Sequence, residues 1–190
     1  VTLYCATAAN PKWHFMKHAG SLTNDAAIFA DSKIDTIIVL DSGDLRYAGV
    51  EQHVKNHRAF IINIDHHMTN EQFGALNIVD ASAASTTNIL FHTLKELGAA
   101  FTPSIATSLL TGLITDTDNF TNAATTPDAM AAASELVKAG GDLKTINDLM
   151  TRNKSIDSLK LNLRFENIQI EHRPHDVRLL KADDFEPGST

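Results

Sequence analysis

Short apolar segments that end abruptly in polar residues recur along the first part of the chain, and each is rich in β-branched residues. They are VTLYCA at 1–6, TIIVL at 36–40 and AFIINI at 59–64. Between them, stretches 24–33 and 44–57 have the spacing of amphipathic helices. Strands that alternate with helices are typical of βαβ units and parallel sheets. The sequence therefore predicts an α/β fold, a parallel sheet with helices on both faces, and a less clear strand at 75–80.

The pattern changes to helices after about residue 85, so that a helical segment follows the sheet. Helices are predicted over 85–98, 102–116, 126–141, 142–151 and 156–171. Thr-Pro pairs at 102 and 126 supply a cap and a first helical residue, and Gly98 suits the position just after a helix.

Composition limits the kind of protein and of site. The 190 residues, 43% of them hydrophobic, are enough for one full-sized core. No run approaches the roughly 18 apolar residues of a membrane span, and no signal-like segment opens the chain, so a cytoplasmic protein without a membrane partner is expected. The single cysteine excludes a cysteine zinc cluster, so any metal must be held by His, Asp or Asn.

The net charge indicates which kinds of partner the protein can bind. A value of −7 argues against a long duplex nucleic acid, because such binding depends on Lys and Arg that neutralise phosphates. A small phosphorylated substrate remains compatible with an acidic site, provided that divalent cations lie between carboxylates and phosphate.

Polar residues end two of the predicted strands. Asp41 follows TIIVL at 36–40, and the triplet Asp65, His66 and His67 follows AFIINI at 59–64. Parallel strands present their carboxyl ends at one edge of a sheet, which is the usual place for ligands. Two simpler interpretations stay open: Asp41 alone suits a turn or a helix cap, and histidines are common on surfaces.

A third candidate is Asp116, which is predicted at the end of an apolar helix. The helix dipole disfavours an anion there by roughly 0.3 to 1 kcal/mol, so a bound cation would be a suitable partner, although an ordinary capping loop is the alternative. Asp41, His66 and Asp116 together offer two carboxylates and one imidazole, a donor set that suits Mn²⁺ or Mg²⁺. Three ligands are too few for two metal ions, and a two-metal site would need about three more.

Four ordered motifs resemble those of the DHH phosphoesterase family. They are the strand ending in Asp41, the triplet Asp65-His66-His67 with the loop to Asn70, ASAASTTNIL at 81–90 and TGLITDTDNFTNAATT at 111–126. The resemblance covers nearly the whole chain.

The resemblance implies a role for each candidate residue. Asp41 matches the carboxylate that bridges two Mn²⁺ ions, and His66 and Asp116 match ligands of one ion; Mg²⁺ or Co²⁺ would also be compatible. His67 matches the histidine that contacts the scissile phosphate, and Asp65 is expected to orient its neighbours. A water molecule between the two ions is the implied nucleophile.

The chain departs from the family pattern in three places. Members usually begin with a His and two Asp in a pattern close to H-x-x-P-D-x-D, which is not found here. They also carry a C-terminal substrate domain, so we expect residues 1–171 to be an N-terminally incomplete DHH domain and 172–190 to be a strand and the start of a linker. Asn88 stands where many relatives have Glu.

The resemblance implies a metal-dependent phosphoesterase similar to the nanoRNase and phosphoadenosine-phosphate phosphatase branch. It would hydrolyse short oligonucleotides or small nucleotide phosphates, and this chain by itself is expected to be inactive or impaired. A family II inorganic pyrophosphatase-like hydrolase and a non-catalytic nucleotide-binding or regulatory module are the alternatives. A homodimer is left open.

Overall fold

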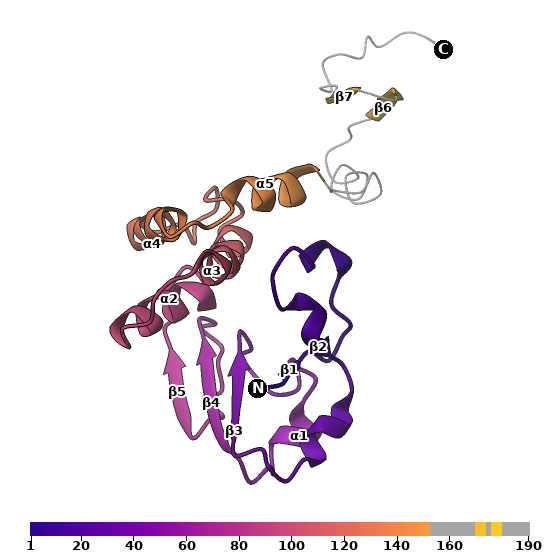
Figure 1. Ribbon diagram of the computed structural model, residues 1–190, viewed down its shortest axis with the longest axis vertical. Coiled ribbons are helices and arrows are strands. Elements are labelled where there is room, and N and C mark those ends of the chain that lie inside the picture. The colour runs from indigo at the N-terminus through magenta and orange to yellow at the C-terminus, as the bar shows by residue number, and fades with distance from the viewer. Residues whose placement is uncertain (153–169, 174–175, 180–190) are drawn as a thin grey trace. The chain divides into compact units, whose positions relative to one another are not determined.

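The structure, a computed structural model, describes residues 1–152, 170–173 and 176–179 (Figure 1). The chain divides into two compact units, Val1–Ile146 and Asn147–Thr190. All candidate site residues belong to the first unit. Among the described residues, no helix combines the length and the apolar character needed to cross a membrane. The expected division at residue 171 stays a prediction.

A parallel three-stranded sheet forms the centre of the first unit. Its strands are β3 (Thr36–Leu40), β4 (Phe60–Asp65) and β5 (Leu76–Val79), in the order β3-β4-β5. The register pairs Leu40 with Ile64, so β3 and β4 end side by side. The predicted α/β class, the parallel sheet and these three strands are confirmed.

The predicted strand at 1–6 is shorter than expected. It is reduced to β1 (Leu3–Tyr4), which pairs in parallel with β2 (Leu22–Thr23) in a separate two-stranded sheet. Tyr4 packs against the apolar cluster under β3. The segment therefore contributes to the core although it does not join the central sheet.

Four helices follow the sheet, close to their predicted places. They are α2 (Thr86–Glu96), α3 (Pro103–Asp116), α4 (Pro127–Lys138) and α5 (Leu143–Arg152). The side chains of Ser85, Thr102 and Thr126 each accept a hydrogen bond from a backbone N–H in the first turn, as N-cap residues do. Gly98 has a φ of 71°, the left-handed conformation that ends a helix.

The two helices predicted before the sheet's second strand are mostly wrong. Residues 24–33 contain only the 3₁₀ segment Ala26–Ala30, and 44–57 contain only α1 (Glu51–Val54). The Asp44 carboxylate accepts a hydrogen bond from Tyr47 N at 2.7 Å, and Gly49 has a φ of 70°. Because of these two features, the first half of the segment forms turns in place of a helix, although its apolar residues still face the sheet.

The helix predicted at 156–171 lies almost wholly outside the described residues. Its last two positions belong instead to β6 (Ile170–Arg173), which pairs antiparallel with β7 (Asp176–Leu179). A strand was expected from 172 onward, so the strand begins two residues earlier than predicted.

Helical cover of the sheet is uneven. On one face, Val39 packs with Leu45, Val50 and Val54 from the loop and α1. On the other face, the side chains of Ile38, Leu40, Phe60 and Leu76 are 44–56% exposed. Helices α2, α3 and α4 gather beyond the carboxyl ends of the strands, where α2 contacts β4 (Figure 1). The ends of β3 and β4 therefore face the helical layer.

Candidate metal centre

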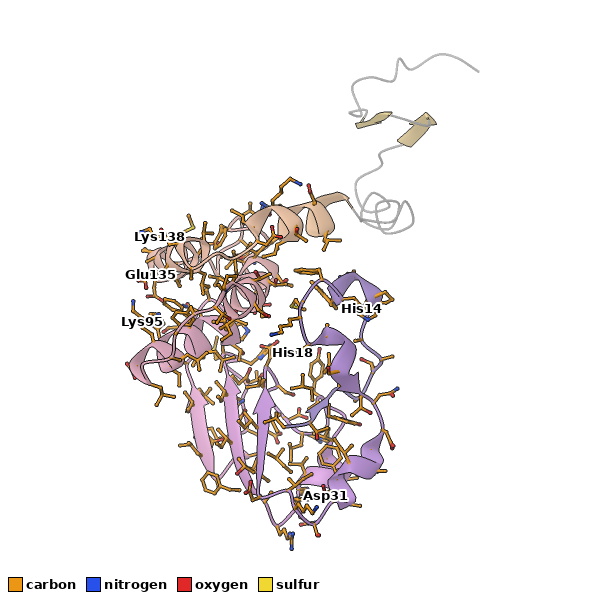
Figure 2. All side chains as sticks on the ribbon, in the orientation of Figure 1. His14, His18, Asp31, Lys95, Glu135 and Lys138 are labelled. Carbon is orange, nitrogen blue, oxygen red and sulfur yellow. The ribbon has the colours of Figure 1, made fainter. Side chains whose placement is uncertain are left out.

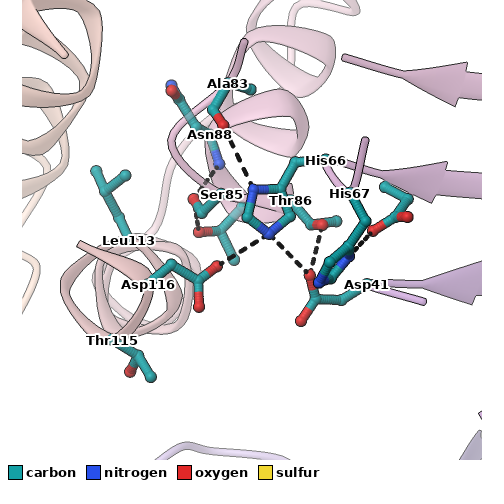
Figure 3. A network of polar contacts seen from close by, with 12 residues as sticks. Asp41, His66, His67, Ala83, Ser85, Thr86, Asn88, Leu113, Thr115 and Asp116 are labelled. Atoms are coloured by element: carbon teal, nitrogen blue, oxygen red, sulfur yellow. Dashed lines mark hydrogen bonds and ion pairs between the residues drawn. The ribbon is translucent and has the colours of Figure 1, made fainter. Parts of the chain in front are cut away.

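Asp41 is the first residue after β3. Its backbone N–H donates to the carbonyl of Ile64 at 3.0 Å, so the pairing with β4 extends by one residue. Its φ of 59° is in the left-handed region, which aspartate adopts more readily than most residues. The carboxylate oxygen Oδ1 accepts a hydrogen bond from Thr86 Oγ1 at 2.7 Å (Figure 3). The strand end and the first turn of α2 thus meet at this carboxylate.

His66 lies between two carboxylates. Its Nε2 is 3.6 Å from Asp41 Oδ1 and 3.8 Å from Asp116 Oδ2 (Figure 3). Its Nδ1 lies 3.4 Å from the carbonyl oxygen of Ala83. A proton on Nδ1 that is directed at this carbonyl leaves the lone pair of Nε2 facing the two acids, which is the arrangement of a metal-binding histidine.

Asp116 is the last residue of α3, and its side chain is 28% exposed. Burial, followed by the negative charge of Asp41, raises the pKa of Asp116 above its ordinary value, although His66 and His67 oppose this shift. The end of the helix dipole adds to the cost of a negative charge there. A cation between these groups would remove that cost.

Each of the two carboxylates lies close enough to His66 to share a divalent cation with it. Metal–nitrogen and metal–oxygen bonds are about 2.0–2.2 Å long, so two ligands of one ion lie no more than about 4 Å apart. The separations of His66 Nε2 from Asp41 and Asp116 are within that limit. The structure therefore places two of the predicted ligands, Asp41 and Asp116, next to the third, His66.

A second grouping of ligand atoms includes His67 in place of Asp116. One ligand atom each of Asp41, His66 and His67 lies within 4.8 Å of the others. The two imidazole rings meet edge to face, with centroids 4.7 Å apart. The two groupings share Asp41 and His66: Asp116 Oδ2 lies 3.8 Å from His66 Nε2, whereas His67, with Nδ1 held by Asp65 at 2.7 Å, offers Nε2.

Asp65 is fully buried and anchors the loop after β4. Burial alone would raise its pKa, but hydrogen bonds from Asn70 at 2.6 Å and His67 at 2.7 Å outweigh burial, so the pKa of Asp65 lies below its ordinary value. The hydrogen bond with Asp65 is also the largest cause of the raised pKa of His67. Asn70 also donates to the carbonyl of Ser42 at 3.2 Å, and so joins the loops that follow β3 and β4.

Two residues at the site were not predicted individually, Thr86 and Asn70. Ser85 indicated where α2 begins, but no sequence pattern shows what the first turn of a helix faces. Asn88, at the position where many relatives have Glu, donates to Asp128 Oδ2 at 3.0 Å. That carboxylate oxygen also lies 2.8 Å from His92 Nε2. The Asn88 amide is therefore engaged with α4 and does not contact the cluster of Asp41, His66 and Asp116.

Comparison with known proteins identifies the family of this chain. A family model described as "DHH family, N-terminal domain" matches residues 3–113. The bifunctional oligoribonuclease and PAP phosphatase NrnA of Thermus thermophilus is 42% identical over 114 residues, which cover 60% of this chain and 34% of that protein. A probable protein of the same name from Streptococcus mutans is 26% identical over 141 residues, covering 71% of this chain and 43% of that protein.

A solved structure supports the fold. The crystal structure of an exopolyphosphatase-related protein from Bacteroides fragilis aligns with a TM-score of 0.78 and 23% identity, and covers 90% of this chain and 53% of that one. At this identity the likeness shows the fold alone. The chain spans about a third to a half of the length of these relatives. The family match includes Asp41 and the Asp65-His66-His67 triplet, and over its 111 residues it covers more than half of the chain, which therefore belongs to the DHH family.

Proposed function

We propose that this chain forms the metal-binding part of a phosphoesterase that hydrolyses short oligonucleotides or small nucleotide phosphates. The observation that carries the proposal is the approach of two carboxylates to His66 Nε2: Asp41, at the end of β3, lies 3.6 Å away, and Asp116, at the end of α3, lies 3.8 Å away. Relatives named oligoribonuclease and PAP phosphatase support the substrate class.

Each residue of the cluster has a chemical task in this proposal. Asp41, His66 and Asp116 hold the cation, for which Mn²⁺ is our first choice and Mg²⁺ or Co²⁺ are alternatives. A divalent cation in such a site neutralises phosphate charge and lowers the pKa of bound water. Two ions are expected in a complete site from the family resemblance, and Asp41 Oδ2, which has no hydrogen bond to any residue that the structure describes, can serve the second ion.

His67 and Asp65 act beside the metal ligands. Asp65 holds Nδ1 of His67 at 2.7 Å, so Nε2 is the ring nitrogen left to meet a phosphate oxygen. The His67 side chain is 45% exposed, whereas Asp65 is fully buried. We therefore assign phosphate contact to His67 and the orientation of its ring to Asp65, in the way that carboxylates orient catalytic imidazoles.

A metal titration tests the site. Calorimetry with Mn²⁺ is carried out on the wild-type chain, on Asp41→Asn and on the control Asp31→Asn. Asp31 lies at the opposite end of the sheet (Figure 2), where its carboxylate accepts only a local hydrogen bond from Lys33 N at 2.9 Å. We expect Asp41→Asn to abolish Mn²⁺ binding and Asp31→Asn to keep it. Equal binding by all three proteins would contradict the assigned site.

A hydrolysis assay tests the substrate class. The complete gene product that carries this chain is incubated with Mn²⁺ and a short oligoribonucleotide, phosphoadenosine phosphate or inorganic pyrophosphate. Release of nucleotide or phosphate from either of the first two is the expected result. Turnover of pyrophosphate alone would favour a pyrophosphatase, and Mn²⁺ binding without any turnover would favour a non-catalytic binding module.

A further inference from the structure

The first turn of α2 makes a contact that the metal ligands do not explain. Thr86 is the first residue of this helix, directly after the N-cap Ser85. The Ser85 hydroxyl is occupied by the backbone N–H of Asn88 at 3.0 Å. The Thr86 hydroxyl instead donates across 45 residues of sequence to Asp41 Oδ1, at 2.7 Å (Figure 3).

Threonine hydroxyls beyond the first turn of α2 and α3 behave differently. They donate to the backbone carbonyl four residues earlier, at 2.7–2.9 Å; they are Thr93, Thr107, Thr111, Thr115 and Thr117, the residue that caps the end of α3. Thr86 has no helical carbonyl four residues before it, because the helix starts at this residue. Its hydroxyl is therefore available for a partner outside the helix.

Asp41 needs such a partner to hold one orientation. Its side chain is 53% exposed, and its backbone is in the left-handed region. Thr86 is 4% exposed, and its β-branched side chain has restricted rotation about χ1. A stiff, buried donor thus fixes one oxygen of a carboxylate that solvent would otherwise leave free to rotate.

The fixed oxygen is the one that faces the histidine. Asp41 Oδ1 accepts the Thr86 hydrogen bond and also lies 3.6 Å from His66 Nε2. A carboxylate oxygen has two lone pairs, so the hydroxyl occupies one and leaves the other directed toward the shared ion. The second oxygen, Oδ2, then points away from Thr86 and stays available.

We infer that Thr86 is a positioning residue whose hydroxyl holds the Asp41 carboxylate in the orientation that binds the cation. The inference rests on the proposed metal site. Groups that orient metal ligands typically contribute about 10- to 100-fold to metal affinity. Thr86 itself touches neither ion nor substrate.

Three variants test this assignment by Mn²⁺ calorimetry. Thr86→Val keeps the shape and removes the hydroxyl, and we expect a Kd about 10- to 100-fold weaker than that of the wild type. Thr86→Ser restores the donor and is expected to stay within about threefold. The matched control, Thr93→Val, removes a hydroxyl of the same helix that bonds only to Ile89 O at 2.9 Å, and is expected to bind Mn²⁺ as the wild type does.

Co²⁺ provides a second measurement that does not depend on activity. The visible absorption of the Co²⁺-loaded protein reports ligand geometry, so Thr86→Val is expected to alter the spectrum and Thr93→Val to leave it unchanged. If Thr86→Val fails to fold, Thr86→Ala and Thr86→Ser take its place, since they differ only in the hydroxyl.

The outcomes separate this inference from the proposed function. Binding by Thr86→Val within about twofold of the wild type, with an unchanged Co²⁺ spectrum, would overturn the positioning role and leave the metal site intact. A wild-type chain that takes up neither Mn²⁺ nor Co²⁺ would overturn both. Equal loss in Thr86→Val and Thr86→Ser would show that the hydroxyl is not the responsible group.

Discussion

Asp65 Oδ1 and His67 Nδ1 lie 2.7 Å apart, and the carboxylate in this pair is fully buried. A buried charge is costly unless hydrogen bonds compensate for the lost water. Here the compensation comes from the His67 ring, from the backbone of His66, and from Asn70 Nδ2, which reaches the other carboxylate oxygen at 2.6 Å. The loop that carries the two histidines is therefore held from inside by a carboxylate that solvent does not reach.

Removal of the Asn70 side chain tests this anchoring. We expect Asn70→Ala to lower the free energy of unfolding by about 1–3 kcal/mol, since a buried carboxylate oxygen loses its partner. Urea denaturation of the metal-free chain at neutral pH measures the change. Glu71→Ala is the control in the same loop: its exposed ion pair with Arg46 at 3.3 Å contributes at most about 1 kcal/mol. An equal effect of the two substitutions would contradict the anchoring role.

The Asp65 carboxyl also predicts how stability depends on pH. Its folded pKa lies below the value of 3.8 for an unperturbed aspartate, so its contribution is present above pH 3.8 and is lost as pH falls through the folded pKa. We expect the difference in unfolding free energy between wild type and Asp65→Asn to be largest between pH 3.8 and 6.5, to shrink below pH 3.8, and to fall as pH rises through the pKa of His67, which Asp65 raises. Denaturation curves in acid and in neutral buffer measure it, and a difference independent of pH would contradict the prediction.

Asp116 predicts the opposite dependence. Its folded pKa is raised, first by burial and then by Asp41, so ionisation of this group opposes folding as pH rises through the folded pKa. Asp116→Asn should therefore make the metal-free chain more stable at neutral pH, and the gain should fall in acid.

Mn²⁺ should reverse the ranking of these two proteins. A cation that binds the folded state stabilises the wild type by mass action, and Asp116→Asn should lose most of that increase because it lacks a ligand. Thermal unfolding with and without Mn²⁺ measures both effects. A variant that is less stable without metal, or equally protected by it, would contradict the assigned role of Asp116.

Close packing of α2 on α3 fixes where Asp116 lies. Gly112 is one turn before Asp116, and a methyl group at position 112 would clash with Cγ2 of Thr87 and lie 2.8 Å from its Oγ1. Gly112→Ala must separate the two helices, because the β-branched Thr87 cannot easily turn away. We expect weaker Mn²⁺ binding together with a loss of about 1–3 kcal/mol in stability.

A double substitution provides the control for the helix contact. Thr87→Ala removes both the methyl group and the hydroxyl that Gly112→Ala would meet, so the pair of changes should recover much of the Mn²⁺ affinity and of the stability. Calorimetry and urea denaturation on the single and double variants form a double-mutant cycle. Additive effects of the two substitutions would mean that this contact does not position Asp116.

The sequence predicted the meeting of Asp41 and His66 for a simple physical reason. Both residues end parallel strands, and adjacent parallel strands end at one edge of the sheet. Asp116 could be predicted as a candidate ligand because an acid at the end of an apolar helix requires a partner. The role of Thr86 could not be predicted, since its contact depends on how α2 docks at the end of β3, which the local sequence pattern does not encode. The helix predicted at 44–57 was mostly wrong for a related reason: apolar spacing alone does not distinguish a helix from turns that bury the same side chains.

Substitution of Leu113 should mainly lower stability, whereas substitution of His66 should mainly remove metal binding. Leu113 of α3 is part of the buried core and is only 1% exposed, so Leu113→Ala should lower the free energy of unfolding by about 2–5 kcal/mol. His66→Ala should instead abolish Mn²⁺ binding with a much smaller loss, because its partners are the acids of the proposed centre and a weak contact with Ala83 at 3.4 Å. Urea denaturation and calorimetry on both variants measure the separation. If His66→Ala were as unstable as Leu113→Ala, His66 would be part of the structural core, and its place between Asp41 and Asp116 would no longer argue for a cation.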